Sequence, residues 1–508
     1  MLKVYALVFI LIFGFFLRYQ NIHALNIVLD FDQYEDLFYT YRLVVDRDLL
    51  IIGRAVYGDA RLHHGVFYYY YNFIPFLISK GSIFISAYWN SFFNLSSAAV
   101  IFFLARSLTG KLSHGLSALF IAALSFEIIK FSNWLTIDSP AIFIIPLMFL
   151  GLWKYYKGKA WGLILASFSL GLALQTDLSF LYHIPILLIY YFLFKPKIPN
   201  IKLFATAIFV FLLTISTLIL TEIKLNFSGI KYMLNFSNTF SDATKLPIMQ
   251  RISAFIEDFS KNFSNNLFPQ RLDLGIYLAA LIILVVLYFL TSEKTKKHEK
   301  MAVAFMLLYL FSPAITLFLG YHDKPWFLIS LPPAIALISG YAISKLKYPI
   351  LILGVLLIIG YSNTKIILDR PKPMFDLFDT IYDSTSYMRY QMDVLNYTYG
   401  QSGGEPFAIN SVTYPLYYNG MWAYLYNYYG KKNFGYIPSW LGGDQIYPYD
   451  LLPTSYGDEK VFYMIISESA RIPDVFKNKG RVWGEDYGGK LLEEKKFTGF
   501  TVLKYGKP

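Results

Sequence analysis

The chain has 508 residues, of which 56% are hydrophobic, 19% aromatic and only 16% charged. Soluble domains carry about a quarter charged residues, so this composition, with a mean hydropathy of +0.44, excludes an ordinary soluble protein. It predicts a membrane protein with a smaller polar part. The absence of cysteine excludes disulfides, thiolate catalysis and cysteine-bound metals.

The first apolar run, residues 4–22, follows a single lysine and has no small-residue cleavage site. We interpret it as a retained transmembrane helix rather than a removed signal peptide. Apolar runs of near-spanning length recur up to residue 362, which predicts a polytopic α-helical membrane protein with about eleven transmembrane helices. The expected spans are 4–22, 82–105, 115–130, 139–153, 160–175, 179–194, 203–222, 273–291, 301–319, 326–345 and 348–362.

The net charge of +11 reflects topology rather than a nucleic-acid partner. Alternate connections are rich in Lys and Arg, which places them and the N-terminus on the cytoplasmic side by the positive-inside rule. The remaining connections, including the loops 23–81 and 223–272, then face outward, as does everything after residue 363. The basic connections are 106–111, 154–159, 195–202, 291–300 and 345–347.

The first outer loop opens on an acidic stretch, LDFDQYEDLFYTYR (29–42), directly after the first span. Its carboxylates are Asp30, Asp32, Glu35 and Asp36. Charge this close to hydrocarbon costs a few kcal/mol per residue unless it has a partner or water. The stretch is therefore either an ordinary solvated loop or a functional site.

The short outer turns favour a functional site, because each carries one aspartate and the short inner turns carry none. The aspartates are Asp138, Asp177 and Asp323. We expect an acidic, aromatic-lined cavity at the outer membrane surface.

The rest of the first outer loop contains three further features. Residues 33–52 are expected to form a helix along the membrane interface. The aromatic run 67–71, which includes Tyr69, is typical of a membrane-interface belt but is also placed to contact substrate. His63 and His64 are metal-ligand candidates, although neighbouring residues on a helix do not share a face.

Residues 363–508 differ in composition and are expected to form a soluble α/β domain on the outer side. The runs 406–412 and 461–467 predict buried strands, and 495–505 predicts a terminal strand pair. The segment 469–480 predicts a helix that ends at a glycine. The sequence contains no P-loop, dinucleotide fingerprint or HExxH motif.

Four segments over residues 1–345 together resemble the GT-C glycosyltransferases, including protein O-mannosyltransferases, aminoarabinose transferases and RgtA-like enzymes. They are LDFDQYEDLF (29–38), LHHGVFYYYYNFIPFL (62–77), FSNWLTIDSPAIFIIPLMFLGLWKYYKG (131–158) and GYHDKPWFLISLPPAIALISGYAI (320–343). The resemblance lies in order and spacing. Gln33 after Asp32 departs from the family's frequent Asp-Glu pair. No WWDYG sequence is present, which disfavours the oligosaccharyltransferase branch.

The resemblance implies transfer of a hexose or pentose from a dolichyl- or undecaprenyl-phosphate donor to a protein, lipid or glycan acceptor in the cell envelope. A hydroxyl acceptor needs a carboxylate to accept its proton as it attacks the anomeric carbon. We expect Asp32 to be that base, with Asp30 as the alternative. Asp138 is expected to orient the acceptor or the donor sugar, or to join a metal site if one exists. A single displacement would invert the configuration.

The departing lipid phosphate needs cationic donors. His322 and Lys324 in an outer turn are the first candidates, with Arg54 and Arg61 of the first loop as further ones. The resemblance does not require a divalent cation, since only some branches of the family use one.

Two alternatives stay open from the sequence. One is a multi-pass transporter or flippase for a lipid-linked substrate, although we find no internal repeat. The other is a polysaccharide polymerase or ligase that acts on lipid-linked glycans.

Overall fold

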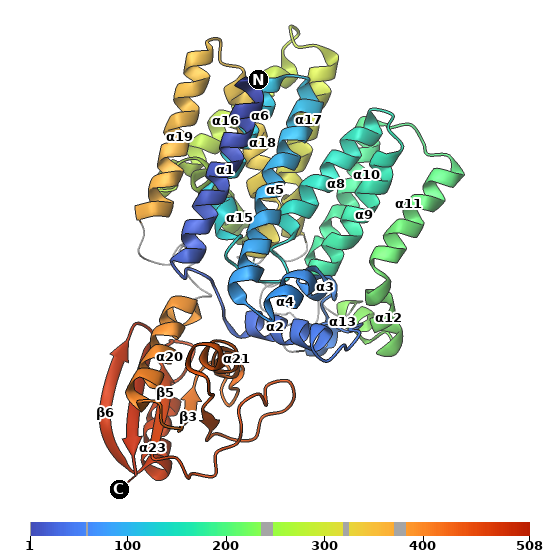
Figure 1. Cartoon of the computed structure of the whole chain (residues 1–508). Helices are drawn as coiled ribbons and strands as arrows, with labels where there is room; N and C mark the ends of the chain where they lie inside the picture. The colour runs from blue at the N-terminus through green and yellow to red at the C-terminus, as the bar shows by residue number, and fades with distance from the viewer. Residues whose placement is uncertain (1, 57–58, 235–246, 319–324, 370–382, 508) are drawn as a thin grey trace.

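The computed structural model describes residues 2–56, 59–234, 247–318, 325–369 and 383–507. A bundle of helices carries the N-terminus at the end farthest from a smaller C-terminal domain, which contains the main sheet (Figure 1). The short helices of the first loop lie between the bundle and this domain.

Six helical segments of the bundle are long and apolar enough to cross a membrane. The bent pair α11 (Ile201–Thr214) and α12 (Ser216–Lys224) adds a seventh if it is one span. Four shorter apolar segments complete the bundle, and each of the eleven expected spans overlaps one of these segments. The six contain α1 (Leu2–His23), α5 (Ile83–Thr109), α16 (Gly275–Thr291), α17 (Lys297–Phe311), α18 (Leu331–Ser344) and α19 (Pro349–Asp369), and the shorter ones contain α6 (Leu112–Leu124), α8 (Ala141–Tyr156), α9 (Trp161–Thr176) and α10 (His183–Phe194). Adjoining 3-10 turns extend the segments of α16, α17 and α18 to Leu272–Thr291, Lys297–Leu317 and Trp326–Ser344, and that of α10 to Leu178–Phe194.

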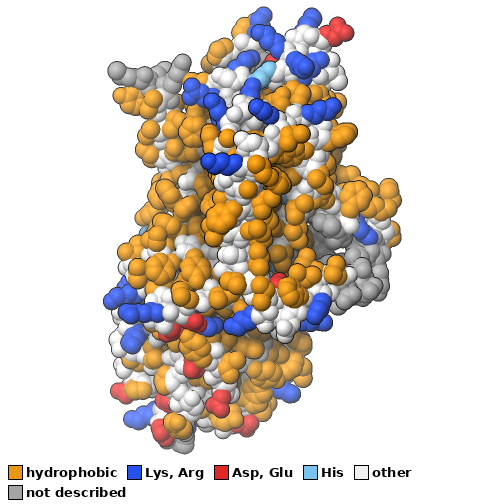
Figure 2. Space-filling model, turned by 90° about the vertical axis from the view of Figure 1, so that its right-hand side faces the viewer, with side chains coloured by type: hydrophobic (Ala, Val, Ile, Leu, Met, Phe, Trp, Pro, Cys, Tyr) orange, Lys and Arg blue, Asp and Glu red, His pale blue; other side chains and the backbone are white. Residues whose placement is uncertain are grey.

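The outer surface of the bundle is apolar, as expected for a protein in contact with lipid. Figure 2 shows hydrophobic side chains over most of the bundle, with Lys and Arg at the end opposite the C-terminal domain and again near its border. Inside the bundle, small residues let helices touch. A Cβ on Gly162 of α9 would lie 2.5 Å from the carbonyl oxygen of Gly151 in α8, which is the close backbone approach typical of membrane helices.

The first outer loop folds into a set of short elements at the end of the bundle. Residue Asp30 caps α2 (Phe31–Val44) in a capping box with Gln33, as its side-chain chemistry predicts. The expected interfacial helix extends to residue 52, but α2 ends earlier, and the backbone turns into the left-handed region at Arg47 (φ 58°). The other elements are β1 (Ala55–Val56), β2 (Asp59–His63), α3 (Phe67–Tyr71) and α4 (Phe73–Ser79).

The second outer loop contributes α13 (Ser228–Leu234) and the amphipathic helix α15 (Ile248–Leu267). Three phenylalanines of α15, at 255, 259 and 263, are buried. Helix α15 packs on α16 and α18, so this part of the loop belongs to the bundle.

The C-terminal domain is built on a five-stranded sheet of order β4-β3-β5-β7-β6. Strands β3 and β5 are parallel and buried, as predicted for residues 406–412 and 461–467, and β6 and β7 form the predicted terminal pair. Helix α19 ends at Asp369, beyond the expected domain boundary at 362. The elements are α20 (Met388–Ser402), β3 (Phe407–Val412), α21 (Gly420–Leu425), α22 (Lys431–Phe434), β4 (Ser439–Trp440), β5 (Val461–Ser467), α23 (Asp474–Gly488), β6 (Lys490–Phe497) and β7 (Phe500–Gly506).

The C-terminal domain is joined to the loop that precedes α2 by backbone hydrogen bonds. The Leu29 N–H donates to Ser386 at 2.8 Å, and the Met388 N–H donates to Ile27 at 3.0 Å. Because paired backbone groups hold a register, these bonds set where α2 lies relative to the domain.

Candidate functional site

Helix α2 places three carboxylates on one face. Asp32, Glu35 and Asp36 are spaced i, i+3 and i+4, which brings side chains together on a helix. Arg54, just before β1, pairs with two of them: its Nη1 lies 3.2 Å from Asp32 Oδ1, and its Nε lies 3.1 Å from Asp36 Oδ1. The Asp32 side chain is 51% exposed, whereas Asp36 is fully buried, so the pair has one solvent-facing and one interior carboxylate.

Arg54 is held by its neighbours on both sides. The N–H of His64 donates to the Arg54 carbonyl at 3.0 Å. The N–H of Arg54 donates to the hydroxyl of Tyr69, which in turn donates to Asp36 at 3.4 Å. Tyr69 is fully buried and stacks on Tyr39 at 5.0 Å between ring centroids, so its ring supports the carboxylates rather than facing lipid.

Two further aspartates approach the same place from the bundle. Asp138 lies in the turn before α8, and Asp177 caps the turn after α9. Asp138 is buried, and its Oδ1 has no hydrogen-bond partner in the part of the chain that the structure describes. Burial, and then the nearby Asp177 carboxylate, raise the pKa of Asp138 well above its usual range, while Arg54 opposes the shift.

The cluster around Arg54 contains more carboxyl groups than the charge of one arginine can neutralise. Burial raises the pKa of Asp36 to about 8, although Arg54 lowers it. Burial also raises the pKa of Glu35. A low-dielectric setting disfavours several like charges, and Asp36 therefore keeps its proton to a higher pH than a free carboxyl group does. The side chain of Asp32 is the one in contact with water.

The C-terminal domain also reaches this cluster. The hydroxyl of Tyr449 donates to Glu35 Oε1 at 3.4 Å. We did not expect Tyr449, and we had not assigned roles to Glu35, Asp36 or Asp177. The i, i+3, i+4 spacing from Asp32 is a sequence signal for Glu35 and Asp36, but no local pattern points to Tyr449.

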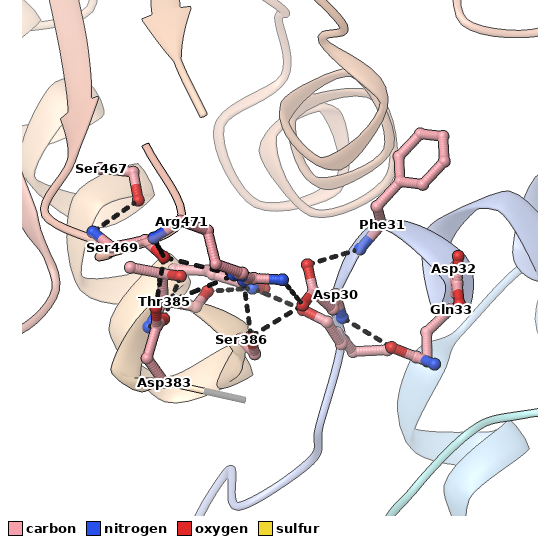
Figure 3. Close-up of polar contacts among 12 residues, drawn as sticks. Asp30, Phe31, Asp32, Gln33, Asp383, Thr385, Ser386, Ser467, Ser469 and Arg471 are labelled. Carbon is pink, nitrogen blue, oxygen red and sulfur yellow. Dashed lines mark hydrogen bonds and ion pairs between the residues drawn. The ribbon is translucent and has the colours of Figure 1, made fainter. Parts of the chain in front are cut away.

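Asp30 faces a different partner from Asp32. Its Oδ2 accepts from Arg471 Nη1 at 2.6 Å and from the Ser386 hydroxyl at 3.1 Å. Figure 3 shows Arg471 reaching Asp30 from the C-terminal domain, with Asp32 on the far side of the helix start. Asp30 is therefore a helix cap and an interdomain ion-pair partner.

The other candidates divide as follows. The guanidinium of Arg61 stacks over the Tyr232 ring, at 4.6 Å from its centroid, and its carbonyl accepts from Ser228 of α13. His322 and Lys324 lie outside the described residues.

The two histidines considered as metal ligands, His63 and His64, lie in different environments. The Nδ1 of His63 lies 2.7 Å from the Gly53 carbonyl. His64 is buried, and burial lowers its pKa well below the usual value. Among the described residues, no group of three or more His, Asp and Glu side chains has an arrangement that could hold a metal ion.

No family model matches the sequence, and no curated protein matches it. Solved structures do match the fold. The chain aligns with ArnT from Cupriavidus metallidurans bound to undecaprenyl phosphate over 99% of its length and 97% of the ArnT chain, at a TM-score of 0.59 and 9% identity. The apo form of that ArnT gives 0.58 with the same coverage and identity.

The archaeal oligosaccharyltransferase AglB from Archaeoglobus fulgidus aligns at a TM-score of 0.47 and 11% identity, over 92% of this chain and 69% of AglB. The likeness to ArnT confirms the expected GT-C-type fold of a polytopic helical bundle with a C-terminal sheet domain.

Proposed function

We propose that the chain is a membrane glycosyltransferase that moves a sugar from a polyprenyl-phosphate donor to an acceptor at the end of the bundle next to the C-terminal domain. One observation carries this proposal: Asp32 of α2, Arg54 before β1 and Tyr69 of α3 meet at one site, where Asp32 faces solvent, in a chain with the ArnT fold. The undecaprenyl phosphate bound to ArnT supports a lipid-linked donor.

Asp32 is the proposed general base. Its side chain is exposed enough to meet an acceptor hydroxyl, and Arg54 at 3.2 Å fixes its orientation. The carboxylate accepts the hydroxyl proton while the oxygen attacks the anomeric carbon, and the bond from that carbon to the phosphate oxygen breaks. One displacement of this kind inverts the anomeric configuration.

The buried carboxyl groups position this base. Asp36 binds the same guanidinium as Asp32, and Asp138 lies close enough to the pair for Arg54 and Asp36 to shift its pKa. A buried network whose members share one arginine holds its geometry more rigidly than a surface pair. Asp138 is proposed to orient the donor or acceptor sugar from this wall.

The leaving phosphate requires positive charge, and Arg54 is already engaged by two carboxylates. His322, Lys324 and Arg61 therefore remain the proposed phosphate-binding residues, with Arg54 contributing to the local field. The proposal covers hexosyl and pentosyl donors.

We propose that the site faces outward from the plasma membrane. The connections rich in Lys and Arg lie at the end of the bundle opposite the C-terminal domain (Figure 1), which supports a cytoplasmic N-terminus by the positive-inside rule. The site and the C-terminal domain are then extracytoplasmic.

The test is sugar transfer in proteoliposomes that contain the full chain and a panel of radiolabelled undecaprenyl- and dolichyl-phosphate sugars, with native membranes as the acceptor source. The variant Asp32→Asn keeps the side-chain shape and removes the base. Asp273→Asn is the matched control, because Asp273 is an exposed aspartate paired with Arg271 at the start of α16.

We expect transfer by the wild type and by Asp273→Asn, and a loss of about a hundredfold or more in Asp32→Asn, the usual contribution of a general base. Equal transfer by Asp32→Asn would remove Asp32 as the base. Lipid-linked sugar that binds or crosses the bilayer without any transfer or hydrolysis would instead favour a transporter.

A further inference from the structure

Two loops of the C-terminal domain present tyrosine rings to solvent beside α2. The first loop, residues 413–419, exposes 49% of Tyr414 and 65% of Tyr417. The second, residues 444–450, exposes 51% of Tyr447. Clustered exposed aromatic rings on a folded surface mark binding sites more often than chance.

The two loops are tied to one another. Gln445 of the second loop accepts from the N–H of Asn419 at 3.0 Å and donates to the Tyr417 carbonyl at 3.0 Å. Tyr417 adopts the left-handed backbone conformation, with φ 71°. This conformation costs of order 1 kcal/mol or more for a bulky residue and is found where the surroundings impose it, often at ligand sites. The loops therefore hold Tyr417 outward at a cost in stability.

Tyr414, Tyr418 and Tyr447 lie along α2, whereas the Tyr417 ring lies next to Phe476 and Trp483 of α23. The Tyr418 ring lies 5.8 Å from Phe31, next to Asp32, and 5.8 Å from Tyr449, which reaches Glu35. Tyr418 thus connects the first loop to the candidate site.

The two ends of this surface are anchored as well. Arg471, the partner of Asp30, lies under the Tyr414 ring at 4.7 Å from its centroid. At the other end of α2, Tyr447 donates to Asp46 and lies over Arg42. The rings that face solvent are consequently held in place before any ligand arrives, which lowers the entropic cost of binding.

The polar groups of these loops suit hydroxyl-rich ligands. Asn419 is buried beside Tyr418, and neither its Oδ1 nor its Nδ2 has a hydrogen-bond partner within the described part of the chain. Asp444 and Gln445 are the first two residues of the second loop. A sugar ring combines apolar C–H faces, which pack on aromatic rings, with hydroxyls that pair with amides and carboxylates.

The surface fits other acceptors less well. An extended peptide adds to a sheet edge, but the edge strand β6 reads KLLEEKKF, and charged side chains on an edge oppose such pairing. The other edge, β4, has only two residues. A lipid acceptor is expected to contact the apolar bundle, whereas these loops belong to the domain beyond its end (Figure 1).

We propose that the surface formed by Tyr414, Tyr417, Tyr418 and Tyr447, here called the tyrosine platform, binds a saccharide acceptor and directs its hydroxyl toward Asp32. This inference rests on the proposed function and names the acceptor class for the same site: a glycan chain rather than a polypeptide or a lipid.

The experiment measures two reactions of the full chain in proteoliposomes with the labelled donor that the panel identifies: hydrolysis of the donor by water, and transfer to native envelope material. The labelled product is then divided into protease-sensitive, solvent-extractable and glycan fractions. The variants are Tyr417→Ser and Tyr447→Ser, with Tyr417→Phe to keep the ring. Tyr456→Ser is the control, because Tyr456 is 89% exposed on another loop of the same domain.

We expect label in the glycan fraction, and an apparent KM for the glycan raised about tenfold in Tyr417→Ser and Tyr447→Ser, a loss of about 1.4 kcal/mol of binding. Donor hydrolysis should stay unchanged, and Tyr417→Phe and Tyr456→Ser should behave as wild type. Label in the protease-sensitive or lipid fraction, or serine variants that match Tyr456→Ser, would overturn the platform.

Failure of the proposed function gives a different result, because then the donor is neither hydrolysed nor transferred by the wild type. In that case saturation-transfer NMR of the purified protein with envelope oligosaccharides tests the platform by itself. Binding that Tyr417→Ser weakens would support it, and binding that is absent or equal in the variant would refute it.

Discussion

The Nη1 atom of Arg471, in the C-terminal domain, lies 2.6 Å from the Oδ2 atom of Asp30, the residue that caps α2. The same α2 carries Asp32 two residues later, so a contact of the C-terminal domain sets the start of the helix that presents the proposed base. The distant domain is thereby a structural part of the site.

Loss of this ion pair should destabilise the docking of the domain. We expect Arg471→Met to lower the free energy of unfolding by about 1–3 kcal/mol, because it leaves the largely buried Asp30 carboxylate without its charged partner. Thermal unfolding and limited proteolysis of the full chain measure the effect. Arg481→Met, which breaks the exposed pair with Glu494, is the control and should cost less than about 1 kcal/mol. Equal losses in both variants would contradict the interdomain role.

Arg54 is expected to be essential for both folding and transfer. Arg54→Met leaves Asp36 buried without its cation, and breaking a buried pair in this way costs about 3–5 kcal/mol. The double variant Arg54→Met/Asp36→Asn should recover part of the lost stability, because the buried carboxylate is gone as well. Chemical denaturation of Arg54→Met, Asp36→Asn and the double variant measures this, and purely additive losses would contradict the coupling of the two side chains.

Stability should fall as the pH rises toward about 8. The folded-state pKa of Asp36, about 8, lies above the unfolded value near 3.8, so the folded state binds more protons between these values and unfolding becomes easier with rising pH. We expect the melting temperature to decrease between about pH 6 and about pH 8, with a smaller decrease in Asp36→Asn. Differential scanning fluorimetry in detergent measures the melting temperature of both proteins across this pH range. If it falls equally with pH in the wild type and in Asp36→Asn, groups other than Asp36 cause the pH dependence.

Gly65 should not tolerate a side chain. A Cβ there would lie 2.1 Å from Gln175 Oε1 and 2.5 Å from the Gln175 carbonyl oxygen, and that same Oε1 accepts from Val66 N–H. Gly65→Ala should therefore cost about 1–3 kcal/mol and reduce transfer, since the neighbouring His64, whose N–H donates to the Arg54 carbonyl, must shift. Gly400→Ala, with no atom within 4 Å, should be neutral or stabilising by up to about 1 kcal/mol. A larger loss of stability in Gly400→Ala than in Gly65→Ala would contradict the close packing of Gly65 against Gln175.

The expected segments of the bundle and the strands of the C-terminal domain follow from local patterns. Apolar runs near spanning length and the basic connections between them predict the helices, because hydrophobic length is read along the chain. The runs 406–412 and 461–467 predict β3 and β5 for the same reason: a buried strand is locally apolar. The early end of α2 was not predicted, since it depends on a left-handed turn at Arg47.

The candidate site shows where local patterns stop. Composition and order alone determined that acidic residues follow the first span and that the short turns without basic clusters carry aspartates. Only the tertiary structure decided that Asp30 turns to Arg471 and Asp32 to Arg54, and that Tyr449 arrives from more than four hundred residues away. The reason is physical: hydropathy is a property of each segment, whereas the partner of a charge depends on which distant segments burial brings within a few ångströms.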